Sequence, residues 1–146
     1  MQPLPIVPEA TPRASLIVTA FDKRRLSGLI DSFRSRTTDH DSLDDLELEL
    51  ERADTVDPWH VPADVITMNS TVELIDLDTG DRLTMTVVFP GAATSAGRVS
   101  VLAPVGRALF GARQGAQIEW PTPTGVRRAT VARVSFQPEA NGQFNL

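Results

Sequence analysis

The strongest constraint on the fold is a change in hydrophobic period near residues 57–62. Before this stretch, apolar residues recur at helical spacing; after it, they alternate with polar residues, as in strands. The stretch itself, Asp-Pro-Trp-His-Val-Pro, carries two prolines, which interrupt both helices and central strands. A chain of 146 residues with one such change predicts a helical segment followed by a β-rich segment, an α+β fold.

Two helices joined by a polar turn are predicted over residues 15–57. Thr19 is placed to cap the first helix, because Asp22 follows three residues later, and Ser42 is placed to begin the second. Each helix has one narrow apolar stripe, which suits pairing with one partner helix better than burial in a thick core. We therefore expect an antiparallel helical hairpin, a short coiled coil. The stripes consist of Leu26, Leu29, Ile30 and Phe33 in the first helix and Leu43, Leu46, Leu50 and Ala53 in the second.

Residues 72–136 predict an antiparallel sheet of about four or five strands with one short helix. Alternating residues 72–74 and 83–89 flank Asp-Thr-Gly-Asp, a turn signal, and form a hairpin. Residues 98–101 form a further short strand, after which Pro104 is suited to the first turn of a helix that Gly111 ends. Residues 117–120 and 126–136 close the sheet as a strand pair.

Composition divides the chain further and excludes several classes of protein. Residues 1–14 hold four of the eleven prolines and predict a flexible tail, before a hairpin over 15–57 and a C-terminal domain over 58–146. The absence of cysteine excludes disulfides, thiolate zinc sites and thiol nucleophiles. No apolar run approaches the roughly 20 residues that span a bilayer, and no secretory signal begins the chain, so we expect a cytoplasmic protein with no membrane contact.

The charge is distributed unevenly along the chain. The net charge of −5 argues against simple binding to duplex nucleic acid. Residues 39–57 contain nine carboxylates and one arginine, whereas residues 98–146 contain six arginines and two glutamates. The distribution is consistent with two solvated faces or with a partner that recognises one of them.

No catalytic signature is present. The sequence has no phosphate-binding loop, no dinucleotide fingerprint and no nucleophile elbow, and His40 and His60 stand alone in polar or proline-rich loops. The predicted hairpin tip gathers carboxylates that suit magnesium, but carboxylates at a helix N-terminus are also favoured by capping and by the helix dipole. We expect no enzymatic turnover, no cofactor and no bound metal. The tip carboxylates are Asp39, Asp41, Asp44 and Asp45.

Three separated stretches resemble one family of bacterial transcription factors. Residues 99–111, Val-Ser-Val-Leu-Ala-Pro-Val-Gly-Arg-Ala-Leu-Phe-Gly, resemble the I-S-x-x-S-P-x-x-x-A-L-x-G stretch of the Gre-factor C-terminal domain, with Ala103 where Gre factors usually have serine. Residues 65–70 and 137–142 are similar to stretches in the branch of this superfamily that includes the regulator of nucleoside diphosphate kinase. Members of that branch resemble Gre factors with a shortened hairpin.

The resemblance implies a fold, a partner and a docking site. The fold is a coiled-coil hairpin on an FKBP-like C-terminal domain. The partner is RNA polymerase: Gre C-terminal domains dock at the rim of its secondary channel, and the hairpin enters the channel. Acidic residues at the Gre tip help to hold a catalytic magnesium where nascent RNA is cut. The contact loop maps to Ser100, Leu102, Ala103, Pro104 and Val105, although Leu102 and Val105 are equally consistent with core positions.

Hairpin length decides between the functions that the resemblance implies. A first helix of about 15 residues gives a hairpin of only ~20–25 Å, shorter than Gre hairpins. The leading hypothesis is therefore a monomeric polymerase-binding regulator that competes with Gre factors without stimulating RNA cleavage, and any effect on nucleoside diphosphate kinase is indirect. The alternatives are a cleavage factor that uses Asp39 and Asp41, and an FKBP-like peptidyl-prolyl isomerase, which the scarcity of aromatic residues disfavours.

The first helix is also predicted to carry a basic outer face. Arginines at this position suit contact with RNA or with acidic channel walls inside the polymerase. The alternative is that they pair with Glu47, Glu49 and Glu51 across the hairpin. The face consists of Arg24, Arg25, Arg34 and Arg36.

Overall fold

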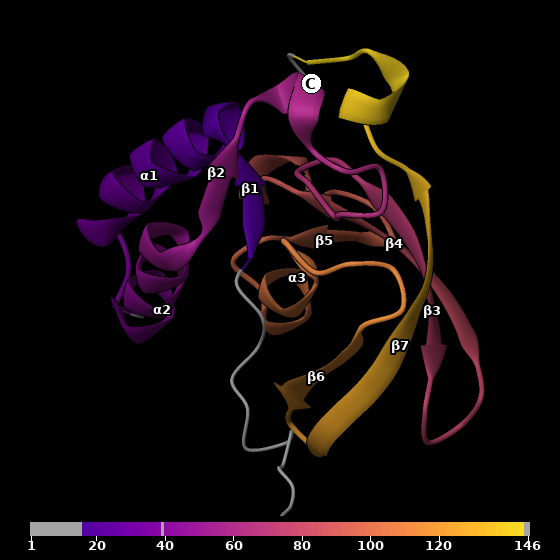
Figure 1. Cartoon of the computed structure of the whole chain (residues 1–146). Helices are drawn as coiled ribbons and strands as arrows, with labels where there is room; N and C mark the ends of the chain where they lie inside the picture. Colours follow the sequence, from indigo (N-terminus) through magenta and orange to yellow (C-terminus); the bar gives the residue numbers. More distant parts are fainter. Residues whose placement is uncertain (1–15, 39, 145–146) are drawn as a thin grey trace, which may run out of the picture.

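The computed structural model describes residues 16–38 and 40–144, in which a helical hairpin lies on one side of a twisted sheet (Figure 1). The predicted tail over residues 1–14 and the tip residue Asp39 lie outside the described residues. The hairpin consists of α1 (Ala20–Arg34) and α2 (His40–Arg52). No helix in the described ranges is long and apolar enough to cross a membrane.

The start of α1 follows the predicted capping, whereas the start of α2 does not. The hydroxyl oxygen of Thr19 accepts the backbone N–H of Asp22 at 3.0 Å, which confirms Thr19 as the N-cap. The prediction that Ser42 begins the second helix was wrong, because α2 begins at His40. A ring nitrogen of His40 lies 2.9 Å from the carbonyl oxygen of Arg34, so a contact across the turn stabilises the earlier start.

A small parallel sheet closes the base of the hairpin, and the sequence analysis did not predict this pairing of strands. Strand β1 (Ile17–Thr19) pairs in parallel with β2 (Asp54–Val56), and the N–H of Asp54 donates to the carbonyl oxygen of Leu16 at 2.8 Å. The pairing holds the entry and the exit of the hairpin side by side. Alternation over three residues was too short to reveal β2 in a segment dominated by charge.

The main sheet has five strands in the order β5-β4-β3-β7-β6. It confirms the α+β prediction, but the sheet is mixed, because β5 runs parallel to β4 and the other pairs are antiparallel. The connection from β4 to β5 includes the 3-10 turn η3 (Pro90–Ala92) and brings β5 alongside the last three residues of β4, 86–88. The strands are β3 (Thr71–Asp76), β4 (Arg82–Val88), β5 (Arg98–Ser100), β6 (Gln117–Thr122) and β7 (Gly125–Phe136).

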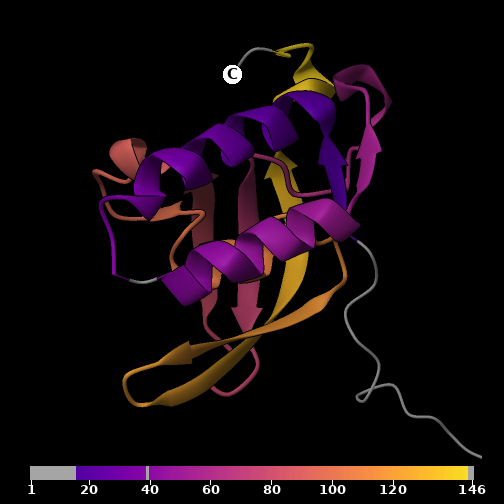
Figure 2. The same ribbon diagram turned by 90° about the vertical axis from the view of Figure 1, so that its left-hand side faces the viewer.

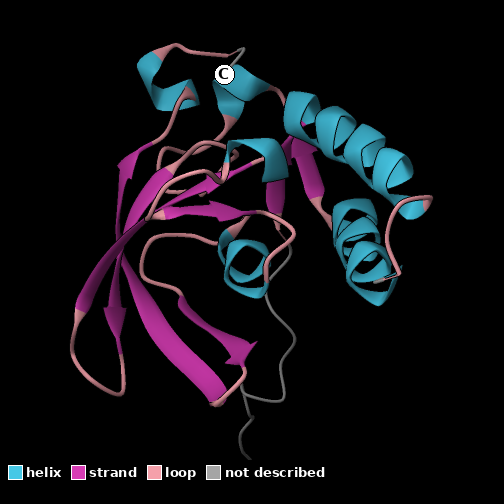
Figure 3. Ribbon diagram, turned by 180° about the vertical axis from the view of Figure 1, so that it is seen from behind, coloured by secondary structure: helices cyan, strands magenta, loops and turns pink. Residues whose placement is uncertain are grey.

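One contiguous core joins the hairpin to the sheet. Figure 2 shows α1 and α2 crossing in front of the sheet. Leu26 and Leu46 are fully buried in the same cluster as Met68, Leu74 and Phe110. The expectation that each apolar stripe pairs only with its partner helix was therefore incomplete, since both stripes also continue the core of the sheet. The short helix α3 (Pro104–Leu109) lies on the same side of the sheet (Figure 3).

Candidate docking site

The predicted contact loop is a tight turn that joins β5 to α3. The hydroxyl of Ser100 accepts the N–H of Leu102 at 3.0 Å, and its carbonyl oxygen accepts the N–H of Ala103 at 3.0 Å. Ala103 is extended, with φ −72° and ψ 153°, and Pro104 occupies the first position of α3. Proline is suited to that position because its missing N–H would have no helical partner there.

The loop residues differ in exposure. Pro104 is exposed, whereas Ser100 and Ala103 are half-buried. Leu102 and Val105 are half-buried and pack against the core. The side chains of Leu102 and Val105 therefore contribute to the core as well as to the surface. Pro104 is the residue of the loop that is most available to a partner.

Gly106 allows α3 to pack directly on the backbone of this loop, and the sequence analysis did not predict this role. It is buried at the first turn of α3, directly against the backbone of Ser100. A glycine inside a short helix is unfavourable by itself, so its presence signals a close backbone approach. That signal was available in the sequence, between Pro104 and the end of the helix.

Next to Pro104 lies a groove built from three separate elements. An ion pair of 3.7 Å between Arg107 on α3 and Asp45 on α2 joins two of its walls. The groove has a volume of about 180 Å³ and combines carboxylates, a guanidinium and proline rings. No single stretch of sequence reveals it, because its walls meet only in the folded chain. The lining residues are Glu49, Pro104, Arg107, Ala108, Glu119 and Pro121.

The carboxylates of the hairpin tip are solvent-exposed and partly engaged with arginine. Asp41, Asp44 and Asp45 are exposed. Arg34 donates to Asp44 at 2.7 Å and to Glu47 at 2.6 Å, and the hydrogen bond to Asp44 raises the pKa of Arg34. Within the described ranges, no group of three metal-binding side chains is positioned to hold an ion.

The four arginines of the predicted basic face have different surroundings. Arg34 pairs across the hairpin, and Arg36 donates to the hydroxyl of Ser32 at 3.0 Å. Arg25 pairs with Asp22 and lies over the rings of Phe21 and Phe89, at 4.2 Å and 4.7 Å from their centroids. Arg24 is exposed, and no hydrogen bond or ion pair joins it to other described residues. The structure therefore leaves Arg24 as the arginine of this set most accessible to a partner.

A buried polar joint fixes the hairpin to the C-terminal part of the chain. Asp22 of α1 is fully buried, accepts the N–H of Met68 at 3.1 Å and pairs with Arg25 at 2.6 Å. The hydroxyl of Thr67 donates to Glu139 at 2.7 Å. Burial raises the pKa of Asp22 and also that of Glu139. Sequence reasoning treated Asp22 only as a capping residue and missed this joint.

Two family models match separate parts of the chain. A family model for the C-terminal part of the transcription elongation factors GreA/GreB matches residues 61–136, and a model for the Rnk N-terminus matches residues 15–56. The regulator of nucleoside diphosphate kinase of Escherichia coli K12 is 36% identical over 136 residues, which cover 92% of this chain and 98% of that protein. The chain belongs to the Rnk family, within the Gre-factor superfamily.

Two further relatives connect this Rnk-family chain to elongation factors. GreA of Rhodopseudomonas palustris BisA53 is 35% identical over 94 residues, 64% of this chain and 59% of GreA. The structure of a transcription elongation factor GreA/GreB from Nitrosomonas europaea is 39% identical, with a TM-score of 0.72, and the match covers 83% of this chain and 99% of that one.

The two stretches that resemble the Rnk family, residues 65–70 and 137–142, supply residues of the buried polar joint. Thr67 and Met68 lie in one of them and Glu139 in the other. Gln137 donates from its amide to the carbonyl oxygens of Pro62 and Val65, both at 2.7 Å. In this Rnk-family chain, residues 65–70 and 137–142 therefore hold the hairpin, the sheet and the C-terminal segment together.

Proposed function

We propose that this chain is an RNA-polymerase-binding transcription regulator that docks through the surface around Pro104. The exposed proline at the first turn of α3 supports this proposal most directly. The loop before it is held by hydrogen bonds that the N–H groups of Leu102 and Ala103 donate to Ser100, so it presents one defined shape to a partner. A preorganised loop loses little conformational entropy on binding. The likeness to GreA/GreB makes the rim of the polymerase secondary channel the proposed docking place.

The same proposal includes competition with Gre factors without stimulation of RNA cleavage. Helix α1 has 15 residues, which corresponds to ~22 Å at 1.5 Å per residue. The ion pair between Asp45 and Arg107 links the second turn of α2 to α3, so this part of the hairpin lies close to the C-terminal domain. A carboxylate must approach magnesium to ~2.1 Å to bind it. A short hairpin that lies close to its own domain is poorly suited to bring the tip carboxylates within this distance of the magnesium in the polymerase active centre.

Arg24 supports a secondary, electrostatic contribution to docking. Its exposed guanidinium is available to an acidic channel wall or to nucleic acid held by the polymerase. A contact of this kind is screened by salt. The other proposed properties follow from the same mode of action: the protein acts as a monomer, has no turnover of its own, and affects nucleoside diphosphate kinase only through transcription.

A competition experiment tests the proposal. Core RNA polymerase is saturated with a labelled GreA-type factor, and this protein is titrated while the bound label is measured by fluorescence anisotropy. We expect full displacement, with a midpoint that rises in proportion to the concentration of the GreA-type factor. A complex that contains both proteins at once, detected by size-exclusion chromatography, would contradict a shared docking place.

A further inference from the structure

The outer face of the main sheet has a hollow that is separate from the docking groove. Along β3, Val72 and Leu74 are buried in the core, whereas Thr71 and Glu73 alternate with them and point to the other face. Helices α1, α2 and α3 all lie on the core side, so none of the three covers this outer face (Figures 1 and 3). At one end of it lies a hollow of about 300 Å³, lined by Asn69, Thr71, Thr86, Arg98 and Phe136.

Asn69 is held in position by an unusual backbone. Its φ is +67°, and it is the sole non-glycine residue with positive φ among those that the structure describes. Its N–H donates to the carbonyl oxygen of Val87 at 2.6 Å, and Ser70 beside it is fully buried. The side-chain amide makes no hydrogen bond to other described residues, so its donor and acceptor are both available at the hollow. Asparagine tolerates this conformation, but it remains costly and recurs at functional positions.

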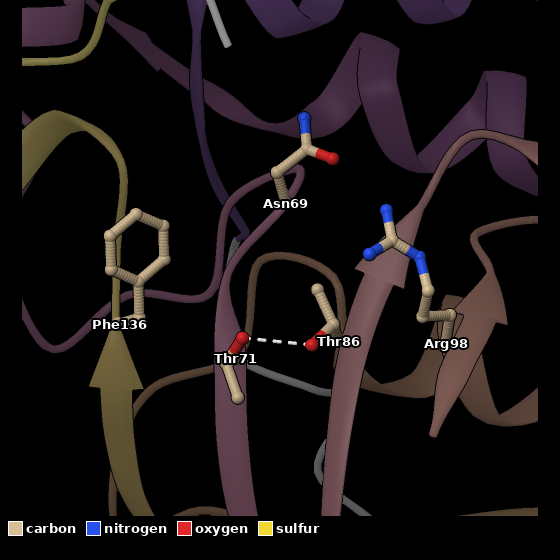
Figure 4. A pocket seen from close by; sticks show the side chains of 5 residues that line it. All are labelled: Asn69, Thr71, Thr86, Arg98 and Phe136. Atoms are coloured by element: carbon tan, nitrogen blue, oxygen red, sulfur yellow. Dashed lines mark hydrogen bonds between the residues drawn. The ribbon is translucent and has the colours of Figure 1, made fainter. Parts of the chain in front are cut away.

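Arg98 supplies a positive charge from the opposite side. Its Nε donates to the carbonyl oxygen of Ala92 at 2.9 Å, which anchors the guanidinium. The two terminal nitrogens make no hydrogen bond within the described part of the chain, and Figure 4 shows them directed toward the space beside Asn69. No acidic side chain lines the hollow among the described residues. Paired guanidinium N–H groups suit the oxygens of a phosphate or a carboxylate.

The floor and the far wall complete the arrangement. The hydroxyls of Thr71 and Thr86 are hydrogen-bonded to each other at 2.8 Å, so one O–H of the pair still has its proton available to a ligand. Figure 4 shows the ring of Phe136 on the side of this pair opposite to Arg98. The hollow therefore combines an anion-binding group, an amide with a donor and an acceptor, and an aromatic ring.

We propose that this hollow binds a mononucleotide: a planar base with one phosphate. Arg98 binds the phosphate, the amide of Asn69 pairs with the edge of the base, and the ring of Phe136 packs against its face. Asparagine amides match the paired donor and acceptor of base edges, and aromatic side chains stack on bases of any kind. The volume of the hollow lies at the lower end of the roughly 300–1,000 Å³ of small-molecule sites, which suits a ligand of the size of one nucleotide. The proposal is independent of polymerase docking, since none of the five lining residues belongs to the groove beside Pro104.

Nuclear magnetic resonance of the full ¹⁵N-labelled chain tests this site. Adenosine monophosphate and uridine monophosphate are titrated separately, and inorganic phosphate, adenosine and uridine are titrated as the separate halves of these ligands. We expect saturable shifts of the backbone amides of the five lining residues with at least one nucleotide. Phosphate alone and nucleoside alone should each bind at least ten-fold more weakly than that nucleotide. The absence of saturable shifts with both nucleotides, or equal affinity for phosphate alone, would overturn the proposal.

Matched variants separate the roles of the groups. Arg98→Gln should weaken nucleotide binding at least ten-fold while leaving the weak nucleoside binding unchanged. Asn69→Gly keeps a residue that accepts positive φ and removes only the amide, so it should weaken both nucleotide and nucleoside binding. Arg82→Gln, which removes an exposed arginine from the other end of β4, is the control and should bind like the parent. Nucleotide affinity unchanged in both Arg98→Gln and Asn69→Gly would show that the ligand lies elsewhere.

Discussion

A Cβ atom on Gly106 would lie 1.9 Å from the carbonyl oxygen of Ser100 and 2.7 Å from its carbonyl carbon. The first turn of α3 thus packs directly on the backbone at the end of β5. Pro104, two residues before Gly106, takes its position from this contact. The geometry of the proposed docking surface therefore requires a glycine at position 106, because any side chain there would overlap the backbone of Ser100.

Replacement of Gly106 by alanine should lower the free energy of unfolding by about 2–3 kcal/mol, because the obstructing atoms belong to the backbone and must move. Urea unfolding measures the change. Gly28→Ala is the control: it lies in α1 with nothing within 4 Å of the added Cβ, so it should be neutral or stabilising by up to about 1 kcal/mol. Equal effects of the two variants would show that the close approach to Ser100 has no energetic consequence.

Replacement of Pro104 by alanine should weaken polymerase binding at least several-fold and change the free energy of unfolding by less than about 1 kcal/mol. The ring is exposed, and its loss mainly adds freedom to the unfolded chain. Binding is measured by anisotropy, and stability by thermal unfolding. Pro123→Ala, at the exposed turn between β6 and β7, should leave binding unchanged. A loss of affinity no greater than the loss of stability would assign Pro104 a purely structural role.

Simultaneous replacement of Asp39 and Asp41 by asparagine should leave polymerase binding nearly intact and leave RNA cleavage at its background rate. Docking is assigned to the loop before α3, and the tip carboxylates are not expected to reach the catalytic magnesium. The measurement uses a backtracked elongation complex with labelled RNA and a Gre factor as the positive control. Cleavage that rises with the parent protein and disappears in the double variant would instead favour the cleavage-factor hypothesis.

Replacement of Asp22 by alanine should destabilise the protein by about 1–3 kcal/mol, because the buried N–H of Met68 loses its acceptor. Asp22→Asn keeps an acceptor oxygen and should cost less. Urea unfolding measures both variants. The comparison tests the joint itself, since the two replacements remove the same charge beside Arg25 and differ in the hydrogen bond. Identical losses would mean that the hydrogen bond from the N–H of Met68 contributes nothing.

Asp76 should make the free energy of unfolding fall at acid pH. Its carboxylate accepts the N–H groups of Asp78 and Thr79 at 2.8 Å and 3.0 Å and pairs with Arg127, which together lower its pKa from 3.8 to about 2. The hydrogen bond from Arg127 is the largest cause. Because the folded state holds the carboxylate deprotonated, the stabilisation is complete above pH ~4 and is lost as the pH falls toward ~2.

The free energy of unfolding of the parent and of Asp76→Asn, measured by urea unfolding at several pH values, tests this account. The parent should be the more stable above pH 5, and the difference should shrink steadily between pH 4 and pH 2. A difference that stays constant over that range would show that the charge of Asp76 does not contribute.

The sequence by itself determined the elements whose signals are local. Apolar spacing and the Thr19 cap predicted α1, the turn signal at residues 78–81 predicted the β3–β4 hairpin, and Pro104 and Gly111 marked the ends of the short helix. Each of these depends on residues within a few positions of one another, which is the range over which hydrogen bonding and side-chain spacing constrain the backbone. The motif stretches also identified the family.

Only the tertiary structure decided how these elements meet. The parallel pairing of β5 with β4, the carboxylate of Asp22 at the N–H of Met68, and the groove between α2, α3 and β6 all join residues distant in the sequence. The apolar stripes of the hairpin illustrate the reason. A stripe specifies that one face must be buried, but the hydrophobic effect is not directional and does not specify against what. Packing of the whole chain made that choice, and placed both helices on the sheet as well as on each other.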